Sequence, residues 1–373
     1  MKNKMLFLPG LNGLRAIASL AVVFSHTTLG LSAFNLDSHL LGTGRGGSGQ
    51  GYRLAEYGVT IFFVLSGFLI TYLLQIENDK QEINIKKFYL RRILRIWPLY
   101  YLYLILVLLT VFVFKNEFLS FYKLIFYVFF AANIPYILNF ALPFLHHFWS
   151  IGVEEQFYSF WPWIIKKVKN NLILILIGLI FIQNLVRVIL WNYFPFSAIA
   201  TFSIVNRFDC MMIGGLGAIL FLNKNSLFLK VVDNAYSQFI ALFILGLLII
   251  NKYHLNAIVD TFIISIVTLT IIIGQINIKN RLISLNTSFF DFFGKISFGI
   301  YVYHPLIIFY CAMFLKDLKM QNSIKYLIVY SSVFIITIIV SYLSFNYFEK
   351  GFIKLKEKFT VVKSSASKFS INE

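Results

Sequence analysis

The chain has 373 residues, of which 59% are hydrophobic and only 13% are charged. Its mean hydropathy of +0.77 excludes an ordinary soluble domain and indicates a polytopic membrane protein. The net charge of +17 would suggest a nucleic-acid partner for a soluble protein. In a membrane protein an excess of Lys and Arg instead reflects the topology, because these residues gather in the cytoplasmic loops. We therefore expect membrane lipids and no nucleic acid as partners.

Ten apolar stretches are long enough to cross a bilayer, so the predicted fold class is an all-α, polytopic integral membrane helical bundle of about ten transmembrane helices. Their ranges are 14–31, 57–76, 96–114, 147–165, 172–190, 205–222, 237–251, 256–276, 296–314 and 324–345. Asparagines, prolines and histidines interrupt a further apolar stretch, 121–145. We predict an interfacial or re-entrant segment there, because a full span would invert every later loop.

The distribution of Lys and Arg orients the predicted bundle. With the N-terminus in the cytoplasm, 22 of the 33 Lys and Arg fall in cytoplasmic segments, as the positive-inside rule requires. The prediction is therefore an integral protein of the plasma membrane, the bacterial inner membrane, with both termini cytoplasmic. Residues 1–348 form the predicted transmembrane domain, and residues 349–373 form a basic cytoplasmic tail that rests on anionic lipid headgroups.

The first apolar stretch carries two ionisable side chains, Arg15 and His26, eleven residues apart. At about 100° per residue they share one helix face, roughly 16 Å apart along the axis. Such groups cost a few kcal/mol in hydrocarbon, so they normally face a protein interior or a water-filled cavity. A histidine bonded to a neighbouring helix would explain His26 alone. The pair favours a functional face, with His26 able to accept a proton near neutral pH.

A cationic helix face precedes the third apolar stretch. Lys87, Arg91 and Arg95 recur every four residues, and Arg92 lies beside them. Positive-inside topology and lipid headgroups would explain this face. The alternative is a docking site for a phosphorylated cytosolic molecule, because guanidinium groups match phosphate oxygens.

Two adjacent carboxylates lie near the outer end of the fourth stretch. Ser150, Glu154 and Tyr158 recur at four-residue spacing and share a helix face. Glu155 points about 100° away from Glu154. A structural ion pair could explain one glutamate, and at least one is expected to meet the cavity or the outer loop.

Later stretches contribute further charged candidates. Arg187 and Arg207 are possible structural partners for a glutamate, and Arg207 with Asp209 offers a charge pair that structure alone could justify. His304, directly before Pro305, either lines the cavity or packs before a helix kink. The two cysteines are far apart in apolar surroundings, so neither a disulfide nor a metal site is expected.

Together these segments resemble the membrane-bound acyltransferase-3 family, whose bacterial members O-acylate surface and secreted carbohydrates. The matching pieces occur in the family's order over nearly the whole chain, and the resemblance is to a stand-alone membrane domain. They are 11–16 with His26, 58–70, Arg92-x-x-Arg95 before Trp97-Pro98, 149–158, 207–209 and 297–305. Each motif is weak alone, but the ordered set is specific.

The resemblance and the charged faces imply an enzyme, a membrane O-acyltransferase that moves an acyl group, expected to be acetyl, from cytosolic acyl-CoA to a carbohydrate hydroxyl. Arg92 and Arg95, helped by Arg91, would hold the CoA phosphates, and Arg15 would hold the donor further along its path. His26 would act as general base on the acceptor hydroxyl or transiently carry the acyl group. No metal is implied.

The expected acceptor-binding set comprises the remaining polar candidates, Ser150, Glu154, Glu155, Tyr158, Arg207, Asp209 and His304. One position departs from the family pattern: many relatives carry an acid where this chain has Thr60. If that acid orients the histidine or binds substrate, another group, such as Glu154 or Glu155, must do so here.

Two other membrane functions are alternatives. A transporter or flippase of a lipid-linked or anionic glycan would use the same charges as a path, but it would predict inverted repeats, and the arginine–histidine stripe does not recur in the second half. A glycan polymerase or ligase would not need the inner arginine face. The acceptor, the acyl chain length and the oligomeric state are not predicted.

Overall fold

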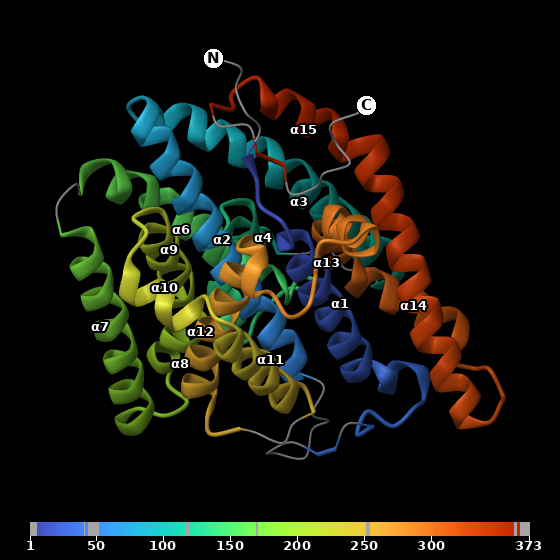
Figure 1. The fold of residues 1–373 in the computed structure, drawn as a ribbon. Helices are drawn as coiled ribbons and strands as arrows, with labels where there is room; N and C mark the ends of the chain where they lie inside the picture. The colour runs from blue at the N-terminus through green and yellow to red at the C-terminus, as the bar shows by residue number, and fades with distance from the viewer. Residues whose placement is uncertain are drawn as a thin grey trace.

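The computed structural model describes residues 6–40, 42–43, 52–115, 120–168, 171–250, 254–361 and 364–365. The described chain is helical apart from one short parallel pair of strands, β1 (Leu6–Phe7) and β2 (Ser364–Ser365). The predicted all-α membrane bundle is confirmed, and β1 and α15 lie at the same end of it (Figure 1).

The helices follow the chain in this order: α1 (Leu11–Leu29), η1 (Leu31–Phe34), α2 (Tyr52–Lys80), α3 (Ile85–Lys115), α4 (Phe121–Val128), α5 (Asn133–Ile137), α6 (Phe148–Lys167), α7 (Leu172–Tyr193), α8 (Ala198–Val205) and α9 (Phe208–Leu222). The second half contains α10 (Ser226–Val232), α11 (Ala235–Ile249), α12 (Ala257–Ile276), η2 (Ile278–Asn280), α13 (Ser288–Leu315), α14 (Asn322–Ser344), the π-helical turn η3 (Phe345–Glu349) and α15 (Lys350–Glu357).

Seven of the described helical segments are long and apolar enough to cross a membrane, or eight if the bent pair α10 and α11 forms one span. The predicted count of about ten is therefore not confirmed. Helices α1 and α6 have 19 and 20 residues, but they carry polar side chains such as Arg15, His26 and Glu154. Both pack inside the bundle, where protein contacts replace lipid.

Close helix packing places α2 beside α9, and it depends on small residues. A Cβ atom at Gly67 would meet the backbone carbonyl of Met211, and one at Gly214 would meet that of Val64. Because glycine has no side chain, the two helix backbones can approach closely, and helices commonly associate in this way within membranes. Helix α1, which carries the Arg15–His26 stripe, lies against both α2 and α13.

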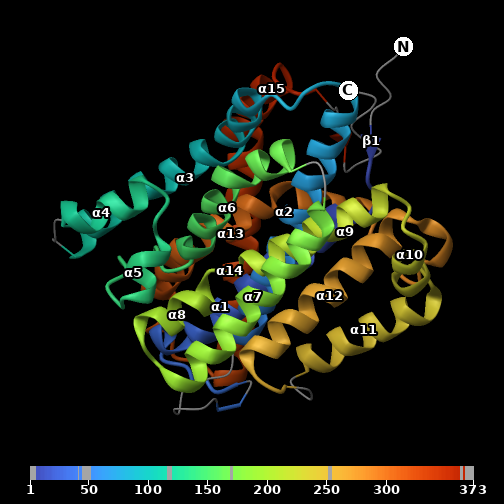
Figure 2. The same cartoon turned by 90° about the vertical axis from the view of Figure 1, so that its left-hand side faces the viewer.

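The stretch 121–145 contains no spanning helix among its described residues. It forms the short helices α4 and α5 and then an irregular chain with left-handed backbone at Asn139 and Phe144. Figure 2 shows α4 and α5 at one side of the bundle, opposite α10 and α11. This agrees with the predicted interruption of the stretch by polar residues and prolines.

The start of the predicted basic tail is ordered as a helix. Helix α14 continues through the π-helical turn η3 into α15, and α15 packs on α3. The tail therefore returns to the bundle at the end where the cationic face of α3 begins (Figure 2).

Candidate active site

A cavity of about 230 Å³ opens among α1, α2, α3, α6, α13 and α15. Its wall combines apolar side chains, such as Phe62 and Ile96, with a concentrated set of charged and hydroxyl groups. The polar lining residues are Arg15, Ser66, Arg92, Arg95, Ser150, Glu154, Tyr158, Ser297, Tyr301 and Lys356. Such a mixture of apolar wall and convergent polar groups is typical of a small-molecule site.

Four cations line this cavity, and they come from three separate parts of the chain: Arg15 from α1, Arg92 and Arg95 from α3, and Lys356 from α15. None of them forms an ion pair within the part of the chain that the structure describes. The Nε atom of Arg92 is buried and has no hydrogen-bond partner among those residues. The cavity is therefore suited to an anionic ligand, because its four cationic side chains outnumber its one carboxylate, that of Glu154.

The same cavity holds one carboxylate, on Glu154. It accepts hydrogen bonds from the hydroxyls of Ser66 on α2 and Tyr158 on its own helix. Ser150 lies one turn before Glu154 on α6, and its hydroxyl is 2.5 Å from that of Tyr301 on α13. The predicted face of α6, with Ser150, Glu154 and Tyr158, thus borders the cavity.

Six predicted site residues lie outside the cavity lining: His26, Arg91, Glu155, Arg207, Asp209 and His304. Arg91 bonds through Nη2 to the Glu77 carboxylate at 2.9 Å and through Nη1 to the carbonyl of Phe359 at 3.0 Å. It therefore fastens the tail to α2 and α3. Glu155 accepts a hydrogen bond from the indole of Trp97 at 3.1 Å, and its other oxygen is buried without a partner among the described residues.

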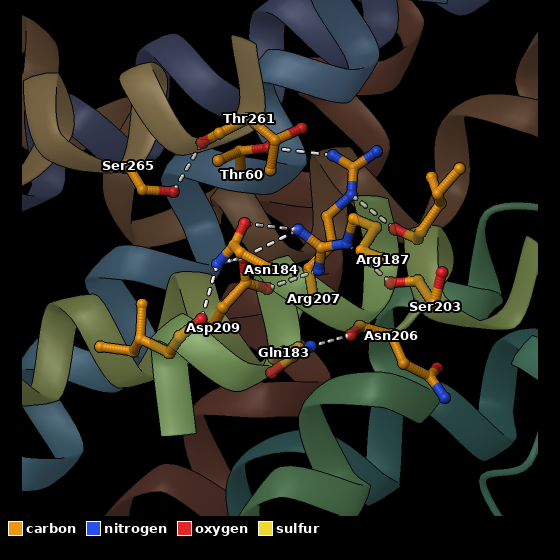
Figure 3. Close-up of polar contacts among 12 residues, drawn as sticks. Thr60, Gln183, Asn184, Arg187, Ser203, Asn206, Arg207, Asp209, Thr261 and Ser265 are labelled. Carbon is orange, nitrogen blue, oxygen red and sulfur yellow. Dashed lines mark hydrogen bonds and ion pairs between the residues drawn. The ribbon is translucent and has the colours of Figure 1, made fainter. Parts of the chain in front are cut away.

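Arg207 and Asp209 do not pair with each other. Arg187 on α7 binds Asp209 through two bonds of 2.7 and 2.9 Å, and both side chains are buried. Figure 3 shows Arg187 directed toward Asp209 while Arg207 is directed toward Thr60. The reason is local geometry. Arg207 occupies the N-cap position of α9 and Asp209 lies in the first turn of this helix, so the two side chains point in different directions.

Arg207 instead bonds to α2, where Nη2 lies 2.6 Å from Glu56 Oε1 and Nη1 lies 3.1 Å from Thr60 Oγ1. Glu56 and Thr60 are one helical turn apart, so both face the arginine. Neither Arg187 nor Arg207 pairs with Glu154 or Glu155.

His26 lies outside the lining of the cavity and bonds to one buried histidine, which packs against a second. Its Nδ1 atom is 2.7 Å from His304 Nε2, and His304 is fully buried. The ring of His147 lies edge-on to His304, with 5.2 Å between the centroids. Tyr301 connects this cluster to the cavity, because its ring lies 5.4 Å from that of His147 and 6.1 Å from that of His304.

The polar residues that sequence reasoning missed are Glu56, Ser66, His147, Ser297, Tyr301 and Lys356. Ser66 and Tyr301 fall inside the segments that carry the family resemblance, but the resemblance does not distinguish them from their neighbours. Glu56 and Lys356 had no distinguishing local pattern. Within the described ranges, no group of three or more His, Cys, Asp or Glu could hold a metal ion.

Comparison with known proteins adds independent information. Residues 8–345 match a family model described as an acyltransferase domain. A "Putative O-acetyltransferase" of Staphylococcus aureus (strain COL) is 29% identical over 377 residues, which cover 94% of this chain and 58% of that protein. This chain therefore spans less than two thirds of that relative's length.

Two further relatives match over shorter regions. "Peptidoglycan O-acetyltransferase OatA" of Listeria monocytogenes serovar 1/2a is 34% identical over 46% of this chain and 27% of its own length. "O-acetyltransferase OatA" of Staphylococcus aureus (strain NCTC 8325 / PS 47) is 36% identical over 44% of this chain and 26% of its own length. No solved structure matches the chain significantly.

Proposed function

The chain belongs to the acyltransferase-3 family, and we propose that it transfers an acyl group, expected to be acetyl, from cytosolic acyl-CoA to a hydroxyl of a cell-surface or secreted carbohydrate. The relatives' names support O-acetyl transfer, and one of them names peptidoglycan. The expected location is the bacterial inner membrane with both termini in the cytoplasm.

The observation that carries the donor assignment is the set of unpaired cations in the cavity. CoA bears several phosphate groups, and guanidinium and ammonium groups bind phosphate oxygens through charge-assisted hydrogen bonds. Arg92, Arg95 and Lys356 would hold these phosphates, and Arg15 would hold the donor further into the bundle. Arg91 would support the site by fixing the tail.

The acceptor side centres on His26. In direct transfer, His26 would accept the proton of the acceptor hydroxyl while the hydroxyl oxygen attacks the thioester carbonyl. The carbon–sulfur bond then breaks, and CoA leaves after taking up a proton. The alternative is an acyl-imidazole on His26 that the acceptor hydroxyl later resolves. In both routes the flexible acyl-pantetheine arm must extend from the cationic cavity past Tyr301 toward His26.

The remaining polar groups of the cavity would bind substrate. Glu154, held by Ser66 and Tyr158, is an acceptor for hydroxyl or amide hydrogens, and Ser150 with Tyr301 offers further hydroxyls. Arg207, Asp209 and Glu155 already bond to other side chains, so we assign them structural roles that keep α2, α6, α7 and α9 in place.

The test is mass spectrometry of surface glycans from a host lacking the gene and from complemented strains. The intact chain should restore the mass of one acetyl group per modified unit, and His26→Ala should not, at equal membrane abundance. Full acetylation with His26→Ala would overturn the role of His26. Unchanged glycan modification with altered glycan export would favour transport instead.

A further inference from the structure

We infer that His304 is a positioning residue that fixes the tautomer and ring orientation of His26, so that the Nε2 atom of His26 is the free base. The inference rests on the proposed function, in which His26 removes a proton from the acceptor hydroxyl. Thr60 is not the partner of His26, since its hydroxyl donates to the backbone carbonyl of Glu56 and accepts from Arg207.

The direction of the hydrogen bonds follows from one backbone carbonyl. His304 Nδ1 lies 3.2 Å from the carbonyl oxygen of Ile300, which can only accept a hydrogen bond. Nδ1 of His304 therefore carries the hydrogen, and Nε2 of the neutral ring carries the lone pair. That lone pair lies 2.7 Å from Nδ1 of His26, so His26 Nδ1 must donate. The remaining nitrogen of His26, Nε2, is then unprotonated.

The surroundings of His304 favour its neutral form. Its side chain is fully buried, and no carboxylate pairs with it among the residues that the structure describes. A buried imidazolium without such a partner would be costly. The neutral ring of His304 thus acts as an acceptor for His26, as a carboxylate does in other catalytic histidine pairs.

His147 packs against the His304 ring, and its own hydrogen bond goes to the backbone of α13 rather than to His26. Its Nε2 atom lies 3.1 Å from the carbonyl oxygen of Val302, two residues before His304 on α13, and its ring packs edge-on against His304. His26 itself is only half-buried, whereas His147 and His304 are buried. The cluster therefore consists of one partly exposed imidazole, that of His26, and the two buried imidazoles of His304 and His147.

The kinetic test compares His304→Gln with His304→Leu in purified protein in lipid nanodiscs. The glutamine amide oxygen can replace Nε2 as acceptor, so H304Q should keep kcat within a few-fold of the wild type. H304L has no acceptor, so its kcat should fall at least about tenfold while KM for acetyl-CoA stays unchanged. Equal kcat values for H304L and the wild type would overturn the inference.

A spectroscopic readout separates this inference from the proposed function. In ¹⁵N-histidine solid-state NMR, with the His26 signals identified by subtracting H26Q spectra, His26 should be protonated at Nδ1 and not at Nε2. H304L should mix or reverse this tautomer, whereas the packing control H147F should retain it. An unchanged tautomer in H304L overturns the positioning role. Full activity of H26Q would instead overturn the proposed base, whatever the NMR result.

Discussion

Arg207 at the start of α9 binds Glu56 on α2, with Nη2 2.6 Å from Oε1, and the same guanidinium donates to Thr60 at 3.1 Å. This contact explains how the chain tolerates Thr60, where many family members are expected to have an acid. In this chain the carboxylate belongs to Glu56, one helical turn before Thr60, and it pairs with Arg207. Neither Glu154 nor Glu155 is needed for this purpose.

A compensating pair of substitutions tests this exchange. Glu56→Gln leaves Arg207 without its anionic partner, so we expect a loss of about 1–3 kcal/mol in the free energy of unfolding. Adding Thr60→Asp places a carboxylate within reach of Nη1 and should recover part of that loss. Thermal unfolding in detergent measures both variants. If adding Thr60→Asp destabilises the E56Q variant further, a carboxylate at position 60 does not act as a partner of Arg207.

The arginines of the cavity should control affinity for the donor. We expect Arg92→Gln with Arg95→Gln to raise KM for acetyl-CoA at least about tenfold, because each lost charge-assisted bond to phosphate is worth about 1.5–3 kcal/mol. The change in kcat should be small, since phosphate binding is equal in ground and transition states. Steady-state kinetics with Lys166→Gln as control checks this. Lys166 pairs with Glu82 and lies outside the cavity.

The tail should contribute to the same site through one lysine. Lys356 lines the cavity, whereas Lys354 on the same helix is exposed and does not. Lys356→Gln should raise KM for acetyl-CoA several-fold, by the loss of a single cation near the phosphates, and Lys354→Gln should not. Equal effects of the two variants would mean that α15 acts only through its general positive charge.

The buried pair between Arg187 and Asp209 should govern stability. Asp209→Asn leaves a buried guanidinium uncompensated, and breaking such a pair costs about 3–5 kcal/mol. We expect D209N to have a low abundance in the membrane and a lowered melting temperature. The fraction that folds should have normal KM values. Replacing both residues by Leu should restore abundance in part. A normal melting temperature for D209N would argue that the pair adds little to the fold.

The contact of α2 with α9 should be sensitive to a single methyl group. Gly67→Ala would force a Cβ atom into the carbonyl of Met211, whereas a Cβ atom at Gly178 on α7 meets nothing within 4 Å. We therefore expect G67A to lower thermal stability by about 1–3 kcal/mol through overpacking, and G178A to be neutral or slightly stabilising. Size-exclusion chromatography after graded heating compares the two variants directly. Equal stability of G67A and G178A would mean that α2 and α9 can move apart to fit the added methyl group without a loss of stability.

The sequence by itself determined the class of the fold and the family. Apolar length and charge bias are local properties, and a helix in a membrane satisfies its backbone hydrogen bonds within its own segment, so the helices could be predicted one by one. The break in 121–145 was predicted for the same reason, from its polar residues and prolines. The count of about ten spans was less secure, because α1 and α6 carry polar residues that protein contacts accommodate.

Only the tertiary structure decided which side chains meet. Helical periodicity put Arg15 and His26 on one face, but packing assigned Arg15 to the cavity and His26 to a histidine on α13. It also directed Arg91 away from Arg92 and toward Glu77, and it returned Lys356 to the cavity from the far end of the chain. Such partners depend on the rotation and spacing of helices distant in sequence, which no local pattern encodes.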